Sequence, residues 1–87
     1  MPNTKSAKKR MRQSARRAAR NRTQRSRMKT LVKRVMAAED ADEAVERYRE
    51  AAAAIDRLGA RRVIHPNKAA RKKAQLARHV KELGGEP

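Results

Sequence analysis

Lysine and arginine side chains recur along the first third of the sequence at a spacing suited to binding a polyanion. Four of them follow one another at intervals of four residues: Lys8, Arg12, Arg16 and Arg20. This interval places them on one face if the segment is helical. Ammonium and guanidinium groups bind phosphate oxygens, and the guanidinium fork can donate two parallel hydrogen bonds. The pattern therefore predicts contacts to a phosphate backbone.

A second basic cluster lies in the last third of the chain, where a helix is expected to start near Asn67, just after Pro66. The free backbone amides of a first helical turn offer a further phosphate site. Asn67 is expected to cap this helix rather than to read a base. His65 has two open interpretations, a contact to nucleic acid or a turn residue, and His79 is expected to face solvent. The cluster consists of Arg61, Arg62, His65, Asn67, Lys68, Arg71, Lys72 and Lys73.

The net charge of +16, from 25 Lys and Arg against nine Asp and Glu, is distributed unevenly. Residues 1–37 hold 14 basic and no acidic side chains, residues 38–58 carry a net charge of −4, and residues 59–87 carry +6. A balance of this kind calls for a polyanionic partner. We expect the partner to contact the first and last thirds, with the acidic middle facing water.

Composition excludes several other classes of protein. Without cysteine the chain can form neither a disulfide nor a thiolate zinc site. The longest apolar run, Ala51 to Ile55, is too short to span a membrane. Too few large apolar side chains are present to enclose a catalytic pocket, and Asp40 with Asp42 is better explained as an acidic first helical turn than as a metal pair. We therefore expect no enzyme and no cofactor.

Three amphipathic patterns supply the elements that must position the charges. An apolar stripe with helical spacing predicts a first helix over about residues 5–38, packed only in its C-terminal part. Asp40 is expected to cap a second helix, with Glu43 three residues later, and Gly59 to end it. The third helix is expected to end at Gly84 and Gly85. The stripe residues are Met28, Leu31, Val32, Val35 and Met36 in the first helix, Ala41, Ala44, Val45, Tyr48, Ala51, Ala52, Ile55 and Leu58 in the second, and Ala69, Leu76, Val80 and Leu83 in the third.

The predicted fold is therefore all-α: a three-helix bundle, formed as one domain over residues 1–87, with an over-long basic N-terminal helix. Residues 1–25 should form a projecting arm and residues 26–87 the bundle. Like charges four residues apart destabilise a helix by roughly 0.2–0.5 kcal/mol per pair. We expect the arm to be largely disordered alone and to become helical when phosphates neutralise it.

Other nucleic-acid readers fit less well. The region around Arg16 to Arg22 superficially resembles a basic leucine zipper, but no dimerising heptad seam follows it. No Phe or Trp is present to stack on single-stranded bases, so contacts to phosphates and shape in double-stranded regions are expected. The arm also has too little apolar surface for a transit peptide. General nucleoid-type DNA binding stays open as the alternative, because charge alone does not separate DNA from RNA.

Three segments of the chain carry a family resemblance: residues 5–10 (KSAKKR), residues 30–35 (TLVKRV) and, most specifically, residues 64–76 (IHPNKAARKKAQL). In order and spacing they resemble the bacterial small-subunit ribosomal protein family numbered twenty, over nearly the whole chain. The resemblance implies a structural protein of the small ribosomal subunit in the cytoplasm. It would bind 16S ribosomal RNA directly and early in assembly, with few protein neighbours and no membrane.

Combining the basic clusters with this resemblance gives a set of expected RNA contacts. In the first helix they are Lys5, Lys8, Lys9, Arg10, Arg12, Arg16, Arg17, Arg20, Arg22, Arg25, Arg27 and Lys29. Around the start of the third helix they are His65, Asn67, Lys68, Arg71 and Lys72.

Overall fold

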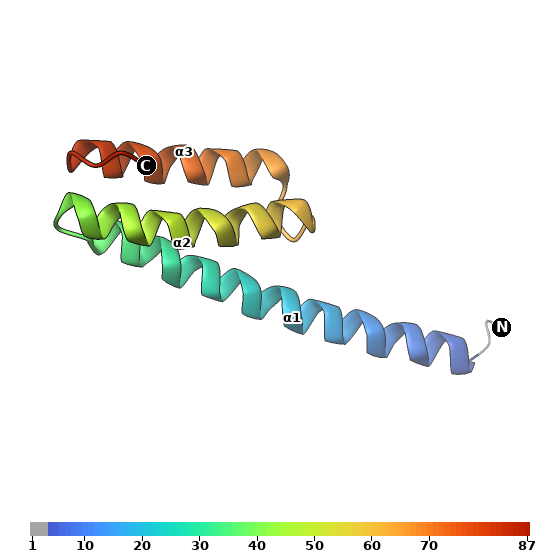
Figure 1. The fold of residues 1–87 in the computed structure, drawn as a ribbon. Helices are drawn as coiled ribbons and strands as arrows, with labels where there is room; N and C mark the ends of the chain where they lie inside the picture. Colours follow the sequence, from blue (N-terminus) through green and yellow to red (C-terminus); the bar gives the residue numbers. More distant parts are fainter. Residues whose placement is uncertain (1–3) are drawn as a thin grey trace.

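The computed structural model describes residues 4–87, which form three α-helices and contain no strand. They are α1 (Thr4–Ala37), α2 (Ala41–Ala60) and α3 (Pro66–Glu82). Successive helices are antiparallel; α2 and α3 form a hairpin, and the N-terminal half of α1 projects past the end of the bundle where α2 turns into α3 (Figure 1). The predicted all-α bundle with an over-long first helix is confirmed. Residues 1–3 of the predicted arm lie outside the described residues.

The two helix starts inside the chain are capped by side chains. Asp40 caps α2, as predicted: its Oδ1 accepts a hydrogen bond from the Glu43 N–H at 2.8 Å. The prediction that Asn67 caps α3 is wrong, because the cap is His65, whose Nδ1 accepts from the Asn67 N–H at 3.1 Å. Pro66 occupies the first helical position, where its missing N–H costs nothing, and so moves the start of α3 one residue earlier. The residue before a proline is held in an extended conformation, as a cap requires.

The ends of α2 and α3 share one hydrogen-bond pattern with different residues. At the end of α3, Gly84 has the left-handed φ of 90°, and Gly85 N–H donates to the Val80 carbonyl at 3.0 Å. At the end of α2 the corresponding bond runs from Val63 N–H to the Leu58 carbonyl at 2.9 Å, and the left-handed residue is Arg62, with φ 57°. Both are Schellman motifs. Glycine is the usual residue at the left-handed position, and Arg62 replaces it here.

Gly59 therefore does not end α2, contrary to the prediction. It lies inside the helix and is buried, and a Cβ added to it would lie 3.1 Å from the Cβ of Ala69 on α3. The missing side chain lets the two helices approach closely beside their connecting turn. A pattern along one helix does not show this requirement, because it is set by the neighbouring helix.

The core is small and apolar. Within residues 4–87 no polar or charged residue is buried, and α1 contributes nothing to the core before Met28. Met36, which was expected in the stripe, is 46% exposed, so that prediction is wrong. His79, which was expected to face solvent, is half-buried, and its Nε2 is buried without a hydrogen-bond partner among the described residues. The buried apolar residues are Met28, Leu31, Val35, Ala38, Ala44, Ala51, Ile55, Leu58, Ile64, Ala69, Leu76 and Val80.

An ion pair links α2 to α3 at the surface of the bundle. The Nζ of Lys73 lies 2.9 Å from Oδ1 of Asp56. The hydrogen bond to Asp56, with the negative charge of its carboxylate, raises the pKa of Lys73 above its ordinary value of 10.5. The Lys73 side chain therefore connects α3 to α2.

Within residues 4–87, none of the three helices has an apolar stretch of the length that a bilayer span requires.

Replacing Arg62 by glycine should stabilise the fold. A left-handed residue with a Cβ costs roughly 1–2 kcal/mol, and the added freedom of glycine in the unfolded chain takes back about 0.4–1 kcal/mol. Arg62→Gly should therefore raise the free energy of unfolding by about 0.5–1 kcal/mol, measured by urea denaturation. Arg61→Gly is the control, because it removes the same charge at φ −84° and should bring no gain. Equal destabilisation by Arg62→Gly and Arg61→Gly would contradict the conclusion that the left-handed conformation of Arg62 costs stability.

Removing the Asp56 carboxylate should destabilise the bundle slightly at neutral pH. Exposed pairs contribute about 0.2–1 kcal/mol, so Asp56→Asn should lower Tm by a few degrees. Because the folded-state pKa of Lys73 is raised, this stabilisation is complete below about pH 10.5 and is lost as the pH rises through the folded-state pKa. The Tm difference between wild type and Asp56→Asn should accordingly vanish at high pH. Glu46→Gln, an exposed carboxylate on the same helix, serves as the control.

Candidate nucleic-acid interface

The basic side chains of α1 cover the helix on every side. All twelve α1 residues predicted to bind RNA are exposed, and α1 contains no acidic residue. At 3.6 residues per turn, neighbours such as Lys8, Lys9 and Arg10 point in different directions, while residues four apart share a face. The helix is about 50 Å long at 1.5 Å per residue. One rod can thus meet phosphates on several sides at once.

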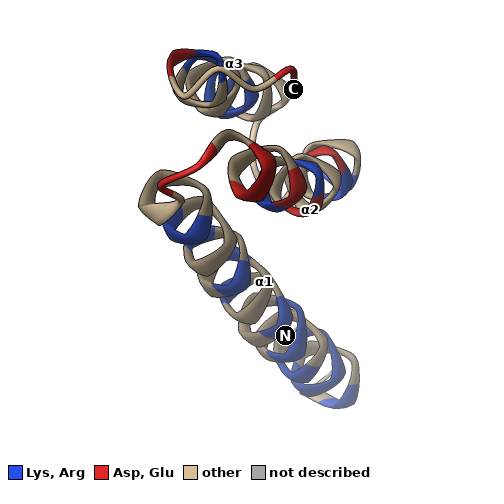
Figure 2. Ribbon diagram, turned by 60° about the vertical axis from the view of Figure 1, so that its left-hand side comes forward, with Lys and Arg blue, Asp and Glu red and all other residues tan. Residues whose placement is uncertain are grey.

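The acidic residues of the bundle are concentrated at one of its ends, where the basic residues Arg34 and Lys81 also lie. Acidic residues gather at the α1–α2 turn and along the first half of α2, as Figure 2 shows. Glu82 is the last residue of α3, and this end of α3 lies beside the α1–α2 turn (Figure 1). The α2–α3 turn and the start of α3 lie at the opposite end, toward which the arm of α1 extends (Figure 1). Most acidic residues therefore lie at the end of the bundle away from the arm, while basic residues occur at both ends.

The start of α3 brings only part of the predicted cluster to the surface. Lys68 and Arg71 are exposed and Lys72 is half-buried, while Lys73 is held by Asp56. His65 is exposed and caps the helix, which requires a ring whose Nδ1 is an unprotonated acceptor and whose Nε2 carries the proton. The capping role and an outward hydrogen bond from Nε2 are compatible, so both earlier interpretations of His65 can hold together.

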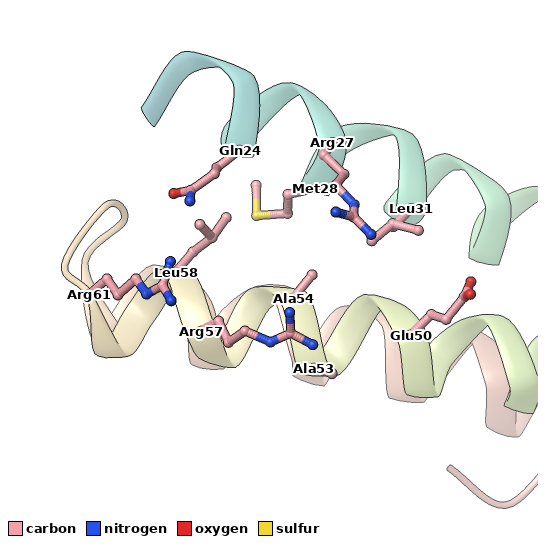
Figure 3. Close-up of a pocket in the computed structure, with 10 residues that line it drawn as sticks. All are labelled: Gln24, Arg27, Met28, Leu31, Glu50, Ala53, Ala54, Arg57, Leu58 and Arg61. Atoms are coloured by element: carbon pink, nitrogen blue, oxygen red, sulfur yellow. The ribbon is translucent and has the colours of Figure 1, made fainter. Parts of the chain in front are cut away.

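Arg57 of α2 and Arg61, the residue after α2, join the basic surface. Neither is among the RNA contacts expected from the sequence, although Arg61 belongs to the second basic cluster. Arg57 and Arg61 line a cleft between α1 and α2, together with Arg27, as Figure 3 shows. The charge of α2 reverses along its length, from acidic residues in its first turn to Arg57 in its last turn. That reversal was visible in the sequence, but a single net charge for residues 38–58 concealed it.

The described residues offer no sign of a metal centre. Residues 4–87 contain no group of three or more His, Asp or Glu side chains that could hold a metal ion. Asp40 is occupied as a helix cap, as expected from the sequence. The chemistry that this surface supports is the binding of anions by exposed cations.

Comparison with known proteins agrees with this picture. Residues 2–81 match the family described as ribosomal protein S20. The chain is 49% identical to the small ribosomal subunit protein bS20 of Chlorobium phaeovibrioides, over 97% of each chain. It is 47% identical to the protein of the same name from Alkalilimnicola ehrlichii, over 98% of this chain and 100% of the relative. For the Magnetococcus marinus protein of that name the identity is 46%, over 95% and 94%. With this coverage and identity, and with the three-helix architecture, the chain belongs to the ribosomal protein S20 family.

Proposed function

We propose that this protein is a structural constituent of the small ribosomal subunit that binds 16S ribosomal RNA directly and supports subunit assembly in the cytoplasm. The role is one of binding without catalysis or a cofactor, among few protein neighbours. The observation that carries the proposal is the exposed, acid-free basic surface of α1 in a chain of the ribosomal protein S20 family. General DNA binding remains the competing function.

The physical basis of the proposal is the mutual repulsion of RNA helices. Closely packed RNA helices repel one another through their phosphates, and an inserted cationic rod removes that repulsion from several sides. The side chains that we assign to this contact are Lys8, Lys9, Arg12, Arg16, Arg20 and Arg25 on α1, with Lys68, Arg71 and Lys72 on α3. The acidic end of the bundle, formed by the α1–α2 turn and the first half of α2, should be repelled by phosphate and so fix the orientation of the protein.

A competition experiment tests this function. Labelled 16S ribosomal RNA is bound by the purified protein at near-physiological salt and challenged with excess random duplex DNA and with unrelated RNA. Non-specific binding weakens steeply with salt, whereas a shaped site should keep its advantage. Survival of the 16S complex supports the proposal. Equal displacement by every polyanion would instead favour general nucleic-acid binding.

Single arginine variants should separate contacts on α1 from scaffold on α2. Arg16→Gln should weaken 16S binding several-fold and reduce the slope of log affinity against log salt by about one, because one phosphate contact is lost. Arg49→Gln, an exposed arginine on α2 among acidic neighbours, should leave both quantities unchanged. Filter binding across a salt series measures both. An equal effect of the two variants would show that only net charge matters.

The arm should become ordered on binding. Among residues 4–20 every side chain is exposed except the half-buried Ala7, so the helix there has almost no burial to offset its like-charge repulsion. Backbone amides of residues 4–25 should exchange rapidly with solvent in the free protein and slowly in the 16S complex, by hydrogen-exchange mass spectrometry. Amides of α2 serve as the internal control and should be protected in both states. Equal protection of the arm with and without RNA would contradict coupled folding.

A further inference from the structure

The cleft between α1 and α2 has a shape and chemistry of its own. The two helices are close at their connecting turn and diverge toward the arm, which leaves a cleft of about 300 Å³ between them (Figures 1 and 3). This volume is at the small end of the range of about 300–1,000 Å³ that is usual for ligand clefts. Side chains of Met28 and Leu31 point down from α1, and those of Ala54 and Leu58 point up from α2 (Figure 3).

The rim of this cleft is cationic. Arg27 reaches into it from α1, Arg57 lines it from α2, and Arg61 lines it from the turn that follows α2. None of these three guanidinium groups has an ion pair within residues 4–87, so their charges are not balanced by the fold. The single acidic group of the lining, Glu50, lies at the opposite end of the cleft from Arg61 in Figure 3, and its Oε2 is 3.9 Å from Arg47. The cleft therefore combines an apolar interior with three cationic groups spaced along its rim, from Arg61 at one end to Arg27 beside Leu31, nearer Glu50 (Figure 3).

We propose that this cleft holds one unpaired nucleotide of the 16S ribosomal RNA, an inference that rests on the proposed function. The base lies against the apolar side chains and beneath the planar Arg27 guanidinium, while its phosphate binds Arg57 and Arg61. Guanidinium planes stack on bases as aromatic rings do, which supplies the stacking surface that a chain without Phe and Trp otherwise lacks. The Glu50 carboxylate can accept a hydrogen bond from an amino group on the base edge.

Charge and shape together favour this occupant over two others. The bases of duplex RNA remain stacked inside the helix, so its phosphates could reach the arginines but nothing would enter the apolar interior. An acidic peptide would bring carboxylates to Arg57 and Arg61, yet it would also bring them toward Glu50. A nucleotide offers a flat apolar body with hydrogen-bond donors at one edge and an anion at the other, which matches a cleft with Glu50 at one end, Arg61 at the other and apolar side chains between them (Figure 3).

Two variants with matched controls test the assignment. Ala54→Leu fills the cleft without altering charge, and Ala74→Leu makes the same change at an exposed position on α3. Arg57→Gln removes one rim cation, and Arg49→Gln removes an exposed arginine of the same helix that does not line the cleft. Thermal denaturation first establishes that each variant is folded. The readout is chemical modification of unpaired bases in 16S ribosomal RNA, with affinity measured alongside.

We expect wild type, Ala74→Leu and Arg49→Gln to protect one unpaired nucleotide that becomes reactive with Ala54→Leu and with Arg57→Gln. Each of the latter should bind about tenfold more weakly, and only Arg57→Gln should change the salt slope. Unchanged protection in both cleft variants would overturn the proposal, as would weaker protection spread evenly over the whole footprint. In a different outcome, an acidic peptide displaces the nucleotide from the cleft of the wild-type protein while the rest of the RNA footprint stays intact. That result would assign the cleft to a protein partner. If the wild-type protein does not bind 16S ribosomal RNA specifically, the proposed function is wrong. This outcome differs from the loss of nucleotide protection that tests the cleft.

Discussion

Electrostatic repulsion within α1 is the constraint on which the rest of this molecule depends. The helix carries basic residues throughout and no acid to balance them. Burial stabilises only its C-terminal part, through Met28, Leu31 and Val35. The protein cannot neutralise the arm of α1 from within, because most of its acidic residues lie at the other end of the bundle (Figure 2) and Asp56 is paired with Lys73. In the proposed complex, phosphates around the arm lower the free energy of this arrangement, so the same imbalance that weakens the free helix favours that complex.

The bundle has few large buried side chains, and its helices pack closely together instead. Four of its twelve buried apolar residues are alanines, and the smallest dimension of the Cα trace is 12 Å. Gly59 against Ala69 lets α2 and α3 approach without a gap. Gly85 has a similar role at the other end of α3, where an added Cβ would lie 2.8 Å from Cγ2 of Val45. Small residues thus replace the bulky side chains that the composition lacks, and most of the large surface stays available for charge.

Much of the fold was predictable because each helix carries its own signals. Asp40 with Glu43, the apolar stripes and the terminal glycines placed the three helices within a residue or two. The errors have different causes. The role of Gly59 depends on a second helix, because Ala69 of α3 lies against it. The cap at His65 is local, because Pro66 takes the first helical position and leaves His65 before it as the cap. The cleft lined by Arg27 and Arg57 depends on the divergence of two helices, which no pattern along one helix reports.

The short connections of this fold have a kinetic consequence. Residues 38–40 join α1 to α2, and residues 61–65 join α2 to α3, so nearly all core contacts form between helices adjacent in the chain. Helical folds with such local contacts form within about microseconds to milliseconds. The bundle therefore forms from contacts between neighbouring helices and needs no partner to bring distant segments together. The first collision is made by a folded body that carries a long charged extension, and this extension widens the radius over which a diffusing partner is captured.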